Sequence, residues 1–179
     1  MKTFFRTCYI LFISVLLSSC AMNDVNHYKD QKPNFDLEKY FIGTSDAWGM
    51  FQQRDGSVVK RFKVTIEGKK INEQLVLDEK FEYDDGSSQQ RIWRLSKQTD
   101  GTWQGRADDV KGIALGQIAG NALHWQYTLL LPVSGSIYEM QMDDWMYLMD
   151  QDTLINRTSM RKFGVELGQV TLFFRRRQG

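Results

Sequence analysis

Cysteine and histidine are scarce in this chain of 179 residues, with two of each, and their scarcity excludes several ways of stabilising or activating a protein. Cys8 lies within an apolar N-terminal segment, and Cys20 lies at the end of it. A chain that loses this segment and carries a modified Cys20 can form no disulfide, even in an oxidising compartment. Packing must therefore stabilise the fold, and 11 Phe, 7 Tyr and 5 Trp supply large side chains for it.

Sequence signatures of catalysis and of metal or phosphate binding are also missing. The histidines have no cysteines or further histidines at zinc-ligand spacing. There is no Gly-x-Ser-x-Gly elbow, and the glycines between Gly112 and Gly120 lack a P-loop lysine and the order of a dinucleotide-binding turn. Paired acids such as Asp143-Asp144 turn only one carboxylate to each face of a strand. We expect no catalytic residues, no metal site and no cofactor, and we favour a protein without enzymatic activity.

Long runs of one charge or of apolar residues are absent as well. Lysine and arginine total 23 against 22 aspartate and glutamate residues, and the one strong basic run, Arg175-Arg176-Arg177, lies at the end of the chain. This balance argues against nucleic acid as a partner. The apolar stretch at 8–17 is shorter than the roughly 20 residues that a membrane-spanning helix needs.

Residues 1–19 have the layout of a bacterial secretory signal, with basic residues at positions 2 and 6 before the apolar stretch. The segment ends in Leu17-Ser18-Ser19-Cys20, which resembles a lipobox, where the cysteine is acylated and becomes the first residue of the mature chain. The resemblance implies palmitate and other acyl chains on Cys20 that anchor the protein in a membrane. Ala21 rather than aspartate follows, which implies the outer membrane and a domain on its periplasmic face.

The rest of the chain is expected to form one domain behind a tether. Residues 20–34 are polar and show no periodicity, so we predict a flexible linker that holds the domain near the lipid surface. Residues 35–179 are long enough to bury a core, and we expect them to be monomeric. At their start, apolar residues at helical spacing in 35–41 precede Gly43, which predicts a short helix.

Beyond this helix, alternating apolar residues and turn signals predict an all-β fold. Asp-Gly pairs mark three hairpin turns, and other glycine-containing segments mark four more. These turns lie at 55–56, 85–86, 100–101, 67–70, 119–122, 133–135 and 162–165. About eight to ten consecutive strands close most naturally into an antiparallel up-and-down barrel of lipocalin-like type, which leaves no exposed edge. A two-sheet sandwich is the alternative.

The predicted strand faces mix apolar and acidic residues. Glu79 shares the apolar face of 75–83, and 137–145 is more mixed still. In the last strand one face is expected to carry Val165, Leu167, Thr171 and Phe173. A solid core would not tolerate unpaired carboxylates, whereas a barrel around a partly wet cavity would. A bulge that turns the acids outward is the alternative interpretation.

The candidate ligand-binding residues combine aromatic area with polar groups near the predicted strand ends. They are Trp48, Trp93, Trp125, Tyr127, Asp144, Asn156 and Arg157. The tryptophans fit a packed core as well as a ligand cage. Arg157 is expected at the barrel rim, where it either pairs with an aspartate as a structural clamp or binds a ligand carboxylate or phosphate.

Several short motifs are spread over the length of the chain. They are Phe35-Asp36-Leu37, Tyr40-Phe41, Ala47-Trp48-Gly49, Asp84-Asp85-Gly86, Ala107-Asp108-Asp109-Val110, Gly120-Asn121-Ala122, Asp143-Asp144-Trp145-Met146-Tyr147, Asn156-Arg157 and Lys162-Phe163-Gly164. Between about Phe35 and Arg176 the chain resembles an uncharacterised family of Gram-negative lipoproteins, a domain of unknown function. The resemblance implies a lipocalin-like barrel and supplies no catalytic residues. Members of that family are often encoded beside enzymes resembling cyclopropane-fatty-acid synthases, which favours lipid handling.

These features together predict an outer-membrane lipoprotein whose periplasmic barrel binds or shuttles a fatty acid, a phospholipid or another apolar ligand. An envelope scaffold with a filled barrel is the alternative from a different class, and an enzyme acting on lipid intermediates is a third. A contiguous apolar cavity of roughly several hundred Å³ would favour binding, and a packed interior would favour the scaffold.

Overall fold

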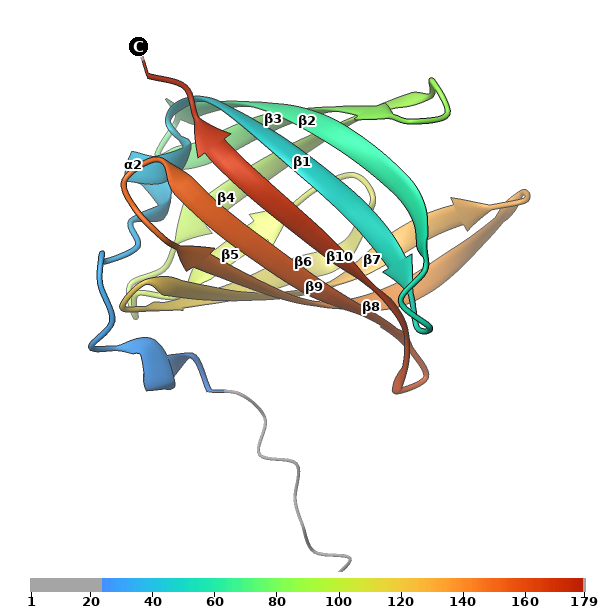
Figure 1. Ribbon diagram of the computed structural model, residues 1–179. Helices are drawn as coiled ribbons and strands as arrows, with labels where there is room; N and C mark the ends of the chain where they lie inside the picture. Colours follow the sequence, from blue (N-terminus) through green and yellow to red (C-terminus); the bar gives the residue numbers. More distant parts are fainter. Residues whose placement is uncertain (1–23, 179) are drawn as a thin grey trace, which may run out of the picture.

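Ten antiparallel strands close into an up-and-down barrel, in which each strand pairs with its neighbour in sequence and β10 pairs with β1 (Figure 1). The computed structural model describes residues 24–178, so the predicted signal at 1–19 and Cys20 lie outside the described residues. The strands are β1 (Gly43–Gln53), β2 (Val58–Ile71), β3 (Gln74–Tyr83), β4 (Ser88–Lys97), β5 (Trp103–Arg106), β6 (Val110–Ala119), β7 (Ala122–Val133), β8 (Ser136–Leu148), β9 (Thr153–Lys162) and β10 (Val165–Arg176). The predicted all-β barrel is confirmed, and the sandwich is excluded.

The Asp-Gly hairpin turns form for a local reason. In the turn after β1, Asp55 accepts hydrogen bonds from the N–H and hydroxyl of Ser57 at 2.9 and 2.6 Å, and Gly56 takes the positive φ that the turn requires. The same arrangement recurs at Asp85 and Asp100. These turns fix the pairing of consecutive strands, so the barrel follows from them with little freedom in topology.

One predicted turn, at 67–70, is wrong. Gly68 lies inside β2, opposite Leu77, and the chain turns instead at Asn72-Glu73, where both residues have positive φ. A Cβ at Gly68 would overlap the backbone carbonyl oxygen of Phe41. This glycine therefore marks the close approach of the N-terminal helix to the barrel wall, and it does not mark a chain reversal.

The last strand does not keep one alternation along its whole length, so Val165, Leu167, Thr171 and Phe173 do not all share a face as expected. The register between β9 and β10 shifts between Glu166 and Gly168, and this bulge reverses the phase of the strand beyond it. Leu172 and Phe174 consequently point into the barrel, whereas Phe173 is on the outer surface. A period-two pattern read from the strand's first residue cannot detect such a shift.

The predicted short helix is present, and it closes one end of the barrel. α2 (Leu37–Phe41) begins at Asp36, whose side chain accepts a hydrogen bond from the backbone N–H of Lys39. The helix buries Leu37 and Phe41, which face the barrel interior. We call this end the closed end, and we call the opposite end, with the turns after β1, β3, β5, β7 and β9, the mouth (Figure 1).

Residues 24–34, which were expected to belong to a flexible tether, pack against the closed end of the barrel. η1 (Val25–Tyr28) buries Val25, and the ring of Tyr28 meets Tyr147 edge-on at 5.3 Å. The backbone N–H of Phe35 donates to the carbonyl oxygen of Gly120 at 2.7 Å. The expected linker is therefore corrected for this segment, because its aromatic and apolar side chains find partners on the barrel wall.

The described residues form a closed barrel with a core of its own. The closed sheet leaves no edge, and one cluster of buried residues joins α2 to the strands. Residues 24–179 can therefore be studied as a self-contained domain. Between residues 24 and 178, no helix has the length and apolar character needed to cross a membrane.

Candidate functional site: a cavity inside the barrel

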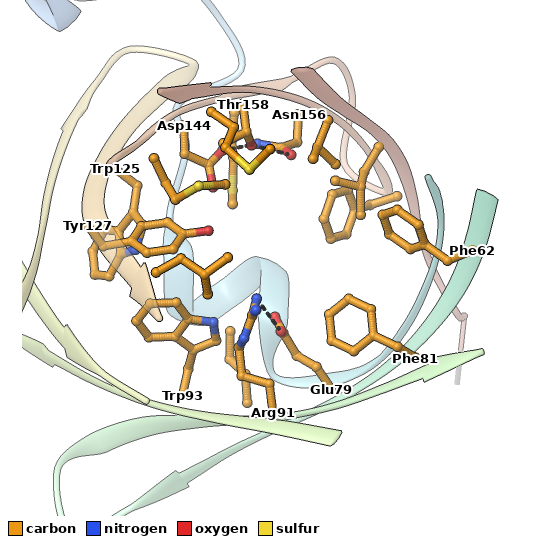
Figure 2. Close-up of a pocket in the computed structure, with 18 of the residues that line it drawn as sticks. Phe62, Glu79, Phe81, Arg91, Trp93, Trp125, Tyr127, Asp144, Asn156 and Thr158 are labelled. Carbon is orange, nitrogen blue, oxygen red and sulfur yellow. Dashed lines mark hydrogen bonds and ion pairs between the residues drawn. The ribbon is translucent and has the colours of Figure 1, made fainter. Parts of the chain in front are cut away.

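A cavity of about 400 Å³ occupies the barrel between α2 and the mouth (Figure 2). Its size is typical of small-molecule sites, which range from about 300 to 1,000 Å³. The floor is apolar and consists of Leu37, Phe41, Leu77, Leu95, Leu123 and Phe174. The upper part is also largely apolar and includes Phe51, Phe62, Leu129, Leu131, Met160 and Val170. A belt of polar groups lies between these two parts.

Two tryptophans form the wall just above the floor. Trp93 of β4 and Trp125 of β7 are 6% and 5% exposed, and their rings meet edge-on at 5.8 Å. Gly105 and Gly116 on the neighbouring strands make room for this arrangement, because a Cβ at either position would overlap the indole ring of Trp125. These tryptophans therefore belong both to the core and to the cavity wall.

One side of the polar belt is an arginine between two carboxylates. Nη2 of Arg91 lies 2.7 Å from Oδ2 of Asp109, in the turn between β5 and β6, and Nη1 lies 3.9 Å from Oε2 of Glu79. Glu79 and Arg91 face each other directly across the ladder of β3 and β4. Burial raises the pKa of Glu79 to about 7, although the guanidinium opposes this rise. Glu79 is thus partly protonated near neutral pH.

The other side of the belt is a buried group around Asp144 of β8 (Figure 2). The side-chain amide of Asn156 donates to the carboxylate of Asp144 and, at 3.2 Å, to the carbonyl oxygen of Trp145. The hydroxyl of Thr158 donates to Oδ1 of Asn156 at 3.3 Å. Burial raises the pKa of Asp144 to about 7, and hydrogen bonds from Asn156 and Thr158 limit the rise. Asp144 is therefore a second acid that is partly neutral at physiological pH.

Tyr127 of β7 lies between these two groups and points its hydroxyl into the cavity (Figure 2). Burial raises the pKa of this hydroxyl, so it remains protonated and available as a donor. Its ring packs edge-on against Trp93 at 5.4 Å. The belt thus offers a ligand a phenol, an amide and two carboxyl groups within an apolar chamber.

Five of the predicted site residues line this cavity, and two lie elsewhere. The five are Trp93, Trp125, Tyr127, Asp144 and Asn156. Asp144 and Asn156 lie inside their strands and not at the rim.

Trp48 and Arg157 are on the outer face of the barrel. Trp48 is 48% exposed on β1, and Nε of Arg157 donates to Oε1 of Gln169 at 3.0 Å. The expected pairing of Arg157 with an aspartate is wrong, because successive residues of a strand face opposite sides and Asn156 takes the inner position.

Arg91 is the important cavity residue missing from the predicted set. The sequence pattern could have identified Arg91, because it alternates with Trp93 and Leu95 along β4 and must share their face. Glu79, by contrast, is found inside the barrel, which is the first of the two placements considered for it. Within residues 24–178, no cluster of three or more histidine, cysteine or acidic side chains is placed to hold a metal ion.

The fold of this chain is similar to that of a solved protein. The S-type phycobiliprotein lyase CPES from Guillardia theta superposes with a TM-score of 0.58 at 7% sequence identity, covering 80% of this chain and 92% of that one. A de novo designed fluorescence-activating β-barrel gives a TM-score of 0.43 at 14% identity, covering 80% of this chain and 99% of the design. The likeness to the lyase concerns the fold alone.

Sequence comparison gives the family. No curated protein matches the chain. Residues 14–176 match the model of a family described as protein of unknown function, DUF3833. The match spans most of the sequence, so the chain belongs to the DUF3833 family.

Proposed function

We propose that the barrel binds an apolar or amphipathic ligand, such as an acyl lipid, in its interior cavity. The observation that carries this proposal is the apolar chamber of about 400 Å³, closed at one end by α2 and open at the other. Each methylene group moved from water into such a chamber contributes about 0.8 kcal/mol. A scaffold with a filled barrel, the main alternative, would contain no such space.

The charges around the cavity favour a ligand whose polar part is neutral. Glu79 and Asp109 flank the guanidinium of Arg91, which is already bonded to Asp109, and Asp144 lies on the opposite side of the cavity (Figure 2). A ligand carboxylate at this level would meet the acids Glu79 and Asp144, while the lining cations Arg91 and Lys60 are already paired with Asp109 and Asp85, so it would lose hydration energy without gaining a free cation. A hydroxyl, ester or amide could instead exchange hydrogen bonds with the hydroxyl of Tyr127 and with the two carboxyl groups.

The proposal includes attachment to a membrane through acyl chains on Cys20, with the domain on the periplasmic face of the outer membrane. The lipobox-like segment Leu17-Ser18-Ser19-Cys20 supports it. Replacing Cys20 with Ser should leave the signal segment uncut and abolish labelling by radioactive palmitate. Labelling of the Cys20→Ser protein would contradict the attachment site without affecting the proposed cavity function.

The ligand is tested by extracting lipids from purified residues 24–179 and identifying them by mass spectrometry. Binding is then measured by displacement of a fluorescent fatty acid with a fatty alcohol, a monoacylglycerol and a fatty acid of equal chain length. We expect the two neutral lipids to compete better than the fatty acid. If none of them binds and no lipid is extracted, the proposed function is wrong; if the fatty acid binds best, only the argument from charge is wrong.

A pair of variants on one strand makes this test specific. Leu131 lines the upper cavity, whereas the neighbouring Leu130 does not line it. Leu131→Trp should narrow the entrance and reduce binding, while Leu130→Trp adds the same side chain without entering the cavity. Equal binding by both variants would show that the ligand occupies another place.

A further inference from the structure

Large apolar side chains are exposed on three hairpin tips at the mouth. The hairpins β7–β8, β9–β10 and β1–β2 are neighbours in the barrel, because β8 pairs with β9 and β10 pairs with β1. We call this group of exposed side chains the lip. It consists of Val58, Val59, Ile137, Tyr138, Phe163 and Val165. Ile137 is 69% exposed and Phe163 is 91% exposed. Isolated apolar residues on a surface are ordinary, but a group gathered on adjacent tips marks a contact surface.

The opposite side of the mouth is polar and acidic. The turn between β3 and β4 carries Asp84 and Asp85, and the turn between β5 and β6 carries Asp108 and Asp109. The apolar character of the lip is therefore not a general property of the turns at this end. A partner that favours the lip would approach the mouth from one side.

The unpaired charge at the lip is positive. The ammonium group of Lys162 lies 4.0 Å from the ring centre of Tyr138 and 5.4 Å from that of Phe163, so the cation sits on the apolar tips themselves. None of the ion pairs within residues 24–178 involves Lys162.

The acids on the same tips are already bonded. Glu139 pairs with Lys111 at 2.6 Å, and Glu166 pairs with Arg161 at 3.5 Å. The turn acid Asp55 accepts hydrogen bonds from Ser57 and keeps its charge, and this charge is balanced by the adjacent Arg54, which forms no ion pair within residues 24–178. The lip thus presents apolar area together with a free cation. This combination complements a partner whose outer layer is anionic and whose interior is apolar.

We infer that the lip docks the mouth of the barrel onto the surface of a lipid bilayer containing anionic phospholipids. The exposed side chains of the hairpin tips enter the boundary between head groups and acyl chains, and Lys162 meets the lipid phosphates. The lip continues into the cavity, because Leu131 and Met160 line the cavity on the strands that lead to these tips. An acyl chain could pass from the bilayer into the barrel without crossing a polar surface.

The lip lies at the end of the barrel opposite to the N-terminal segment. Tyr28 and α2 pack at the closed end, ten or so residues of strand away from the hairpin tips (Figure 1). Docking through the lip therefore does not compete with an anchor at Cys20, and an anchored protein would present its mouth away from the anchoring leaflet. Docking is also independent of which ligand the cavity holds.

The test is co-sedimentation of residues 24–179 with vesicles of phosphatidylglycerol and with vesicles of phosphatidylcholine. We expect the wild-type domain to sediment with phosphatidylglycerol vesicles. The double variant Ile137→Ser, Phe163→Ser should weaken partition by about a hundredfold, because it removes two large apolar side chains from the contact. Lys162→Gln should reduce the preference for phosphatidylglycerol by about fivefold. Leu115→Ser is the matched control, since Leu115 is 58% exposed on β6, away from the lip.

A second measurement follows insertion directly and does not depend on weakened binding. Both cysteines of the chain, Cys8 and Cys20, lie before residue 24, so a single cysteine can be introduced into the domain and labelled. An environment-sensitive dye at Phe163→Cys should shift to the blue when vesicles are added, and the same dye at Leu115→Cys should not.

The inference is wrong if the wild-type domain sediments with neither kind of vesicle. It is also wrong if the double variant sediments as well as the wild type, or if the dye at position 163 shows no change. If vesicles are not bound and the double variant instead abolishes self-association in sedimentation velocity, the lip is a protein–protein surface and docking to lipid is wrong.

Discussion

Replacing Asp144 with asparagine should remove a pH-dependent cost of folding. The carboxyl group has a pKa of about 7 in the folded chain, because it is buried, and a pKa of about 3.9 in an unfolded chain. At a pH between these two pKa values, the carboxyl group is protonated in the folded chain and ionised in the unfolded chain. The free energy of unfolding of the wild type therefore falls as the pH rises through this window, and this group adds no slope below or above it.

The magnitude follows from the difference between the two pKa values. About three pKa units at 1.36 kcal/mol each give a cost of roughly 4 kcal/mol when the window has been crossed. The stability advantage of Asp144→Asn over the wild type should grow by about 3 kcal/mol between about pH 5 and about pH 8. Asparagine keeps the shape of the side chain and an oxygen that accepts the hydrogen bond from Asn156, so the substitution creates no cavity.

Urea denaturation of residues 24–179 at several pH values measures this difference. Asp78→Asn is the control, because Asp78 precedes Glu79 on β3 and faces outward, where it accepts a hydrogen bond from Gln90. The free energy of unfolding of Asp78→Asn should depend on pH in the same way as that of the wild type. The reasoning is refuted if the difference between Asp144→Asn and the wild type does not change with pH, or if the variant is less stable throughout, since the ionised carboxylate would then be needed in the fold.

Three other substitutions give distinct outcomes in the same assay. Glu79→Gln should gain about 2–3 kcal/mol relative to the wild type between about pH 5 and about pH 8, because burial raises the pKa of Glu79 to about 7; a constant difference would contradict this. Trp125→Ala should lower the free energy of unfolding by about 3–5 kcal/mol, since it empties a buried site. Gly116→Ala should cost about 1–3 kcal/mol in the wild type, because its Cβ would overlap the ring of Trp125, and much less in the Trp125→Ala background. Additive effects of the last two changes would show that the contact does not matter.

The topology could be predicted from the sequence because its turns are local. Each Asp-Gly pair specifies a hairpin by hydrogen bonds within a few residues, as at Asp55 and Ser57, and a chain of hairpins has few ways to close. The misread turn at Gly68 depends on a distant contact with Phe41, which no local pattern records. The alternation of β10 was predicted incorrectly for a related reason, because a period-two pattern does not reveal a bulge.

The site could be predicted only in part, because the sequence gives the face of a residue more readily than its partner. The aromatic pattern of β7 placed Trp125 and Tyr127 correctly inside the barrel. Strand alternation put Asn156 inward and Arg157 outward, yet both were expected at a shared rim. The pairing of Arg91 with Asp109 joins a strand to a turn 18 residues away, and only the closed barrel brings these groups together.

The buried acids account for the hollow interior as well as for its polarity. If apolar side chains filled the space beside Glu79 and Asp144, their unbonded oxygen atoms would lose contact with water at a cost of several kcal/mol, on the order of 2–7 for each group. In a hollow barrel these atoms face the cavity, where there is space for water or for the polar part of a ligand to bond them. The closed sheet, with every strand paired on both sides, supplies the stability that tolerates them. The stability that Asp144→Asn recovers should therefore be accompanied by weaker recognition of the ligand's polar group, and this trade-off is what distinguishes a binding site from a structural pair of acids.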